Sequence, residues 1–337
     1  MLKKNIDLYL EFMNYIPSAP QSPKQMLQQA SSNDDITIST WREQWLKQIK
    51  ANKQKYGSFA DHSVGKLNGR HQGMTAIIAG SGPSLKENAH LLKDRGNILL
   101  ISCLHNYHFF KDLGVKVDYW LTLDAGEVTI EEVSEGGKLS PDEYFESTKG
   151  ENLLAFIGTH PKLLEKWQGN VLFYNSPMPD LNIIKEIDEI ELFNALISTG
   201  GNVLGACFYF AKLIGCGPIA FIGADFSFSS NRKFHAWDSK YDSKVGNVIR
   251  HIDIFGNKAV TWQSYFNFKL WFEAMCERVP GIYINCTEGG ILGAYFEGNI
   301  QAIRQMALKD FLEIFNMHKM IEKSCSNPSN PERQILF

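Results

Sequence analysis

A turn of two glycines, a proline and two serines directly follows a short apolar run, and these residue types can hold an anion. The run covers residues 74–79, and the turn consists of Gly80, Ser81, Gly82, Pro83 and Ser84. Glycine can adopt positive φ and has no Cβ to keep a ligand away from the backbone. Proline and serine commonly open a helix, whose first N–H groups are free to bind phosphate. The pattern predicts a phosphate or nucleotide site, with a purely structural turn as the alternative.

The turn differs from two well-known nucleotide-binding patterns. Leu85 stands where the dinucleotide fingerprint G-x-G-x-x-G has its third glycine, and the lysine spacing of a Walker loop is missing. About twenty residues further on, Ser102 and Cys103 occupy the region where that fingerprint has an acidic residue for the ribose. A dehydrogenase is therefore disfavoured.

Two aspartates come at the ends of predicted strands. Asp124 ends the stretch VDYWLTLD, and Asp225 follows an apolar run in IGADFS. Ligands of open α/β sheets gather at the carboxyl ends of strands, so Asp124 is expected to bind a ribose, a divalent metal or an acceptor. Together the two carboxylates can hold Mg²⁺, or one of them can serve as a general base. A turn or helix-capping role is the alternative for Asp124.

His235 lies in a long polar segment, residues 226–262, which is predicted to be a loop that carries function or disorder. We consider it a candidate for acid–base chemistry or for contact with a phosphate, and His251 is the second candidate. Arg232 and Lys233 flank His235. They either neutralise phosphate charge or are ordinary surface charges.

Two further small-residue turns are predicted nucleotide contacts. The first contains Ser198, Thr199, Gly200 and Gly201 before a predicted helix, and the second contains Asn285, Thr287 and Glu288 before a glycine pair. An ordinary N-cap explains the first as well, and a structural turn explains the second. The aromatic residues of 265–272 are predicted to belong to the core rather than to stack on a base.

Short apolar runs alternate with helix-length segments from residue 73 onward, which predicts an α/β fold with a Rossmann-like parallel sheet. We expect a helical N-terminal extension over residues 1–70, in which a polar connector at about 22–35 separates two helices. The nucleotide-binding domain is expected over residues 71–300. Residues 301–337 are expected to form a C-terminal helix and a polar tail.

The composition excludes several classes of protein. The 337 residues are 44% hydrophobic and 21% charged, with a net charge of −3, so nucleic acid is not expected as a partner. The six cysteines form no C-x-x-C pair and several lie in apolar runs, which favours buried thiols in a cytoplasmic protein. We expect neither a secretory signal nor a membrane span. The sequence does not indicate an oligomeric state.

Five stretches together resemble the family that joins the motility accessory factor glycosyltransferases of flagella with archaeal 6-hydroxymethylpterin diphosphokinases. They are residues 76–92, 100–124, 198–228, 232–238 and 284–295. The G-x-G-P-S-L opening at residues 80–85 is also similar to that of bacterial sialyltransferases with a CMP-sialic acid donor. The resemblance covers roughly residues 70–300 and leaves the N-terminal segment uncovered.

The resemblance implies a nucleotide-dependent transferase. It places the nucleotide phosphates on the turn at residues 80–84. The first hypothesis is a glycosyltransferase with a CMP-activated nonulosonic, sialic-acid-like donor, in which His235 or a carboxylate takes the acceptor proton or a histidine protonates the departing phosphate. The second is an ATP-dependent diphosphokinase in which Asp124 and Asp225 hold Mg²⁺. The third is a non-catalytic nucleotide-binding assembly factor.

Overall fold

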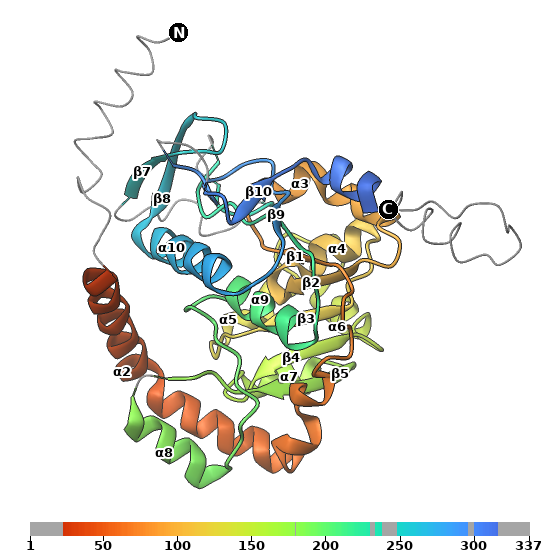
Figure 1. The fold of residues 1–337 in the computed structure, drawn as a ribbon. Helices are drawn as coiled ribbons and strands as arrows, with labels where there is room; N and C mark the ends of the chain where they lie inside the picture. Colours follow the sequence, from red (N-terminus) through yellow and green to blue (C-terminus); the bar gives the residue numbers. More distant parts are fainter. Residues whose placement is uncertain (1–22, 179, 230–232, 238–247, 296–299, 316–337) are drawn as a thin grey trace, which may run out of the picture.

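One eight-stranded sheet forms the centre of the molecule, and every neighbouring pair of its strands runs parallel. The structure is a computed structural model, and it describes residues 23–178, 180–229, 233–237, 248–295 and 300–315. The strand order is β10-β9-β6-β1-β2-β3-β4-β5 (Figure 1). The α/β fold with a Rossmann-like parallel sheet is therefore confirmed.

Unbroken apolar sequence explains the position of the central strands, because both faces of a parallel sheet are covered. All residues of β1, β2, β3 and β6 are buried. The strands are β1 (Ala76–Ala79), β2 (Leu99–Cys103), β3 (Tyr119–Thr122), β4 (Asn152–Phe156), β5 (Asn170–Tyr174), β6 (Ile219–Ile222), β9 (Tyr283–Asn285) and β10 (Ile303–Gln305).

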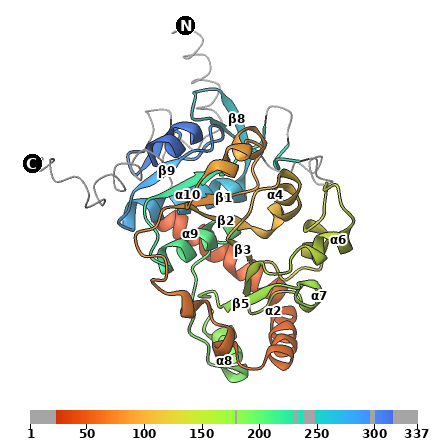
Figure 2. The same cartoon turned by 90° about the vertical axis from the view of Figure 1, so that its right-hand side faces the viewer.

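Helices cover both faces of the sheet, as two consecutive residues of β3 demonstrate. Tyr119 packs on Phe210 of α9 (Val203–Leu213), whereas Trp120 packs on Tyr107 and Phe110 of α4 (Tyr107–Leu113). Because successive side chains of a strand point to opposite faces, α9 and α4 lie on opposite sides (Figure 2). The shorter helices between strands are α3 (Leu85–Asn88), η3 (Ala89–Asp94), η4 (Leu104–Asn106), α5 (Val128–Glu132), α6 (Pro141–Glu146) and α7 (Pro161–Lys166).

The N-terminal segment packs beside the β5 edge of the sheet (Figure 1). A single helix, α2 (Pro23–Tyr56), replaces the connector and second helix that were predicted, because no proline or glycine interrupts the chain after Pro23. The first predicted helix lies outside the described residues. α2 contacts α8 (Leu181–Ile190), while η1 (Phe59–His62) and η2 (Val64–Leu67) contact β5.

The predicted long loop at 226–262 contains an antiparallel hairpin, so that part of the prediction was wrong. Its strands are β7 (Val248–Ile252) and β8 (Lys258–Trp262), and α10 (Gln263–Arg278) follows directly. The C-terminal segment also begins with a strand, β10, before residues 308–315 form a helix. Within the described part of the chain, no helix has both the length and the apolar character to cross a membrane.

The order of the strands reverses at β1. The chain passes from β1 to β2 on one side, while β6 pairs with β1 on the other side. Such a switch point leaves room between the loops that follow the two strands, and ligands of open α/β sheets bind there. The candidate site lies at this position.

Candidate functional site

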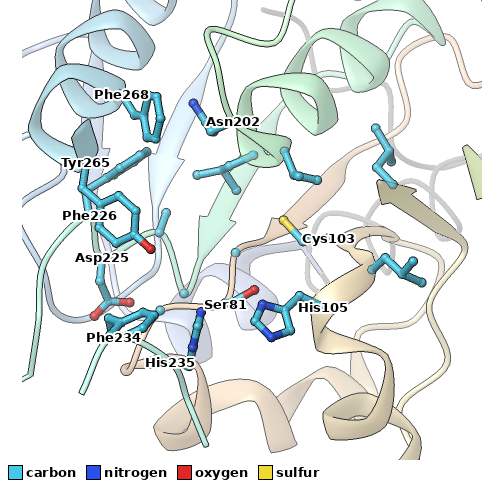
Figure 3. Close-up of a pocket in the computed structure, with 18 of the residues that line it drawn as sticks. Ser81, Cys103, His105, Asn202, Asp225, Phe226, Phe234, His235, Tyr265 and Phe268 are labelled. Carbon is cyan, nitrogen blue, oxygen red and sulfur yellow. The ribbon is translucent and has the colours of Figure 1, made fainter. Parts of the chain in front are cut away.

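A cavity of about 220 Å³ opens at the carboxyl ends of β1, β2, β3 and β6. Its walls include the turn at 80–82, residues 103–105 after β2, Asp124 after β3 and residues 223–227 after β6. Phe234 and His235 add a further wall, and α10 contributes Tyr265 and Phe268 (Figure 3). The cavity therefore combines a polar side with an aromatic side.

The glycines of the first turn serve the close approach of β6 and not the positive φ that was predicted. Neither Gly80 nor Gly82 has positive φ. A Cβ on Gly80 would lie 2.5 Å from the carbonyl oxygen of Gly223, and a Cβ on Gly82 would lie 2.0 Å from Oδ2 of Asp225. Close packing between β1 and β6 therefore requires glycine at both positions.

The helix after this turn offers little to an anion. α3 has only four residues, and the N–H of Ser84 at its start donates to the carboxylate of Asp225. The Ser84 hydroxyl also donates to Asp225, with 2.7 Å between Oγ and Oδ2. Pro83 is buried and does not line the cavity. The expected cap and free helix N-terminus are therefore occupied from inside the protein.

Ser81 is the residue of the turn that remains available to a ligand. It lines the cavity, and its backbone N–H has no protein acceptor among the residues that the structure describes. Its carbonyl oxygen accepts a hydrogen bond from the N–H of Ala236 at 3.1 Å. This contact ties the segment with His235 to the turn.

Asp225 is a buried carboxyl that the fold holds firmly. Only 5% of the residue is exposed. Burial raises the pKa of Asp225 to about 7, and the hydrogen bonds from Ser84 partly offset this effect. Its carbonyl oxygen accepts from the N–H of Ile291 at 2.8 Å. Burial therefore favours the protonated form of this carboxyl more than in an exposed aspartate.

Asp124 differs from Asp225 in being open to the cavity. The residue is exposed, and its carboxylate accepts no hydrogen bond from the described part of the protein. The protein that surrounds the cavity nevertheless raises the pKa of Asp124 by desolvation, which the nearby His105 partly offsets. Asp124 can thus receive a ligand hydroxyl or a proton.

The two aspartates line one cavity but do not form a built metal site. The described residues contain no group of three or more histidine, cysteine or acidic side chains placed to bind a metal. Asp225 is already engaged by Ser84, so Asp124 is the carboxylate of this pair that is free to coordinate. A cation here would need most of its ligands from a substrate.

Two imidazoles lie side by side beside Ser81 (Figure 3). The ring centroids of His105 and His235 are 4.5 Å apart, and His235 stacks on Trp237 at 5.3 Å. Burial, with a smaller contribution from the neighbouring His105, lowers the pKa of His235 to about 3. Nε2 of His105 lies 3.6 Å from the carboxylate of Glu135. At neutral pH His235 is therefore an uncharged ring.

The turn at 198–201 lies behind the cavity and is held by α10. None of its four residues lines the cavity, whereas the next residue, Asn202, does. Asn202 is also the N-cap of α9, with its side chain accepting from the N–H of Gly205, so Ser198 and Thr199 do not cap the helix. Trp271 packs against Gly200, where a Cβ would come within 2.2 Å of the indole ring.

The last predicted turn is used inside the protein. Asn285 donates to Leu292 and Gln305, and the hydroxyl of Thr287 accepts from the N–H of Ala224. Glu288 accepts from Asn88 and from the N–H of Leu308. None of the three turn residues Asn285, Thr287 and Glu288 lines the cavity. They hold β9 beside β6 and the helix at 308–315.

Two other candidates from the polar segment stand apart from the cavity. His251 is buried in β7, where its ring packs against Phe266. Its Nδ1 lies 2.7 Å from the carbonyl oxygen of Ile252. Lys233 does not line the cavity, and Arg232 lies outside the described residues.

The sequence-based predictions missed or misassigned several residues that line the cavity. His105 comes two residues after the strand end at Cys103, so the rule that led to Asp124 also applied to it. Tyr265 and Phe268 were assigned to the core, yet both line the cavity, whereas Phe272 is fully buried as predicted. Helical spacing alone could not show which aromatic rings face a cavity.

Comparisons with known proteins identify the family and show a similar fold. The profile of the family described as "6-hydroxymethylpterin diphosphokinase MptE-like" matches residues 43–231, more than half of the chain. No curated protein matches the chain. Among solved structures, the MAf glycosyltransferase from Magnetospirillum magneticum AMB-1 is similar over 82% of this chain, with a TM-score of 0.56 and 13% identity.

The structural likeness concerns the fold, since identity is low. This chain spans 42% of the length of the MAf glycosyltransferase chain. The family profile, in contrast, covers β1 to β6 and hence most of the loops that form the cavity. The chain therefore belongs to the 6-hydroxymethylpterin diphosphokinase MptE-like family.

Proposed function

We propose that the protein is a nucleotide-dependent glycosyltransferase whose donor is a CMP-activated, sialic-acid-like sugar. The observation that carries this proposal is the charge of the cavity. It is lined by two histidines and by three acidic residues, Asp124, Glu132 and Asp225, and no lysine or arginine of the described residues lines it. The fold likeness to a MAf glycosyltransferase supports the same class of reaction.

The number of phosphates decides between the possible donors. A CMP-sugar carries a single phosphodiester charge, which the N–H of Ser81 and the imidazole N–H groups can bind. ATP carries a triphosphate, and enzymes that use it surround the phosphates with lysine, arginine and Mg²⁺. The residues that line this cavity fit the smaller charge better.

The proposed reaction breaks the bond between the donor sugar carbon and the phosphate oxygen. An acceptor hydroxyl forms the new bond to that carbon, and its proton passes to the carboxylate of Asp124, whose raised pKa makes it a better base than an aspartate with the ordinary pKa. CMP leaves with the electron pair of the broken bond. His105 and His235 donate hydrogen bonds to its phosphate. The low pKa of His235 leaves its ring neutral at pH 7, so this ring donates a hydrogen bond and does not transfer a proton.

A diphosphokinase that uses ATP is the alternative, and the description of the matching family favours it. In that case Asp124, and Asp225 after it releases Ser84, would hold Mg²⁺, which would neutralise the phosphates. EDTA should abolish this reaction, whereas it need not affect transfer from a CMP-sugar.

A thermal-shift screen with CMP, CTP, ADP and ATP, each with and without Mg²⁺, tests the proposal. A ligand that binds only the folded protein raises Tm. We expect stabilisation by CMP without metal, followed by transfer or hydrolysis of CMP-sialic or CMP-pseudaminic donors. Stabilisation by ATP and Mg²⁺ alone would favour the diphosphokinase. A nucleotide that binds and is never consumed would favour an assembly factor.

A further inference from the structure

The aromatic wall, which we define as Phe226, Tyr265 and Phe268, lies across the cavity from the two imidazoles (Figure 3). Phe226 directly follows Asp225, and the other two come from successive turns of α10. Both residues from α10 are partly exposed, whereas Phe272 of the same helix is fully buried. The wall thus offers free ring surface on one side of the cavity only.

The rings are fixed in position by glycine and by other aromatic residues. Phe268 packs on Gly201, where φ is 80° and a Cβ would come within 2.9 Å of the phenyl ring. Tyr265 lies between Trp262 and Phe268, with ring centroids at 5.3 Å and 6.3 Å. Rings that are held in this way lose little freedom when a ligand binds.

Phe226 adds a backbone feature to the wall. Its φ of 51° lies in the left-handed region, which residues other than glycine rarely adopt. The carbonyl oxygen of Phe226 accepts a hydrogen bond from the hydroxyl of Thr261 in β8, and this contact helps hold the conformation. Such backbone strain is concentrated at ligand sites in folded proteins.

The two sides of the cavity suit two parts of one ligand. The side with Ser81 and the imidazoles offers N–H donors to a phosphate, whereas the aromatic wall offers ring faces, with the carboxyl of Glu132 near Tyr265. Planar heteroaromatic rings stack on such faces, and the stacking contributes about 1–3 kcal/mol per base. A nucleotide has a planar base at one end and a phosphate at the other.

We propose that Tyr265 and Phe268 form the subsite for the nucleobase of the donor, so that the nucleotide lies with its base on α10 and its phosphate beside Ser81. The orientation rests on the proposed function, in which the donor is a nucleotide. The pterin ring of an acceptor has the same planar chemistry and would compete for the same wall. The two sources are separated by the experiment below.

Binding of CMP and of ribose 5-phosphate to the full chain, measured by calorimetry, tests the proposal. Ribose 5-phosphate has the sugar and phosphate without the base. We expect CMP to bind roughly 5-fold to 100-fold more tightly than ribose 5-phosphate. Phe268→Leu and Tyr265→Leu should remove most of this ratio while the affinity for ribose 5-phosphate stays unchanged. Leucine is chosen because it preserves much of the packed volume.

Two controls separate stacking from a general effect on α10. Phe266→Leu changes a ring of the same helix. This ring packs against His251 and does not line the cavity, so the substitution should leave the ratio unchanged. Phe268→Tyr keeps an aromatic face and should retain the preference for CMP. Tm of each variant shows that it is folded.

The outcomes of this experiment distinguish the subsite from the proposed function. Loss of the CMP preference in both leucine variants supports the subsite, even if no CMP-sugar is ever consumed. Equal affinity of the native protein for CMP and ribose 5-phosphate overturns it. So does an unchanged ratio in the leucine variants, whatever the transferase activity. Binding of a free pterin that the leucine variants lose, without any preference for CMP, overturns the nucleobase assignment.

Discussion

Ser84 donates both its hydroxyl and its backbone N–H to the carboxylate of Asp225, and this contact joins the start of α3 to the end of β6. The sequence places the two residues far apart, and each was expected to face a ligand. Their mutual hydrogen bonds instead close the floor of the cavity between β1 and β6. The part of the turn that still faces a ligand is therefore Ser81, with His105, His235 and Asp124 around it.

Replacement of Gly82 by alanine should destabilise the protein. The new Cβ would lie 2.0 Å from Oδ2 of Asp225, and overpacking of this kind costs about 1–3 kcal/mol. Gly289→Ala is the matched control, because its Cβ would be 3.6 Å from the same carboxylate, in ordinary contact. The free energy of unfolding in urea measures both changes. Equal stability of the two variants would contradict the packing role of Gly82.

Asp225 should make the protein less stable as pH rises. Burial raises the pKa of Asp225 from 3.8 to about 7, so in this window the folded protein holds a proton that the unfolded chain releases. Its stabilising contribution is complete below pH 3.8 and is lost as pH approaches 7. Asp225→Asn keeps one acceptor oxygen for Ser84 and does not titrate. The free energy of unfolding of the native protein, minus that of the variant, should decrease across this window.

His235 should make the protein more stable as pH rises, over a pH range that overlaps that of Asp225. Burial lowers the pKa of His235 from 6.5 to about 3. Between these two pH values the unfolded chain therefore binds a proton that the folded protein does not bind. The contribution of the neutral ring is complete above pH 6.5 and is lost as pH falls toward 3. His235→Phe keeps an aromatic ring on Trp237. The free energy of unfolding of the native protein, minus that of the variant, should decrease as pH is lowered from 6.5 toward 3. A constant difference would exclude the effect.

The sequence predicted the sheet well because its strands carry their own signal. Residues 76–79 and 219–222 are unbroken apolar runs that end in glycine, and burial on both faces of a parallel sheet requires such runs. The hairpin at 248–262 carried a weaker signal. Val248–Ile252 mixes charged and apolar residues, and β8 alternates exposed and buried positions within a segment that reads as polar.

The candidate site was predicted in part, for a similar reason. Strand ends can be read from the sequence, and this rule placed Asp124 and Ser81 at the cavity. It did not tell which polar residues would bind one another, as Ser84 and Asp225 do. Contacts between distant loops decide that question, and they also turned Phe268 toward the cavity. Spacing within one helix contains no information about them.

Asp124→Asn should remove most of the transferase activity and leave nucleotide binding intact. The amide cannot accept the acceptor proton, and loss of a general base lowers kcat by about 10²–10⁴-fold. In the native protein, activity should fall as pH decreases, with a midpoint above the usual range for aspartate, because desolvation raises the pKa of Asp124. Asp142→Asn, an exposed change on α6, is the control. A variant that loses CMP affinity while kcat is retained would show that Asp124 binds the nucleotide and does not take the proton.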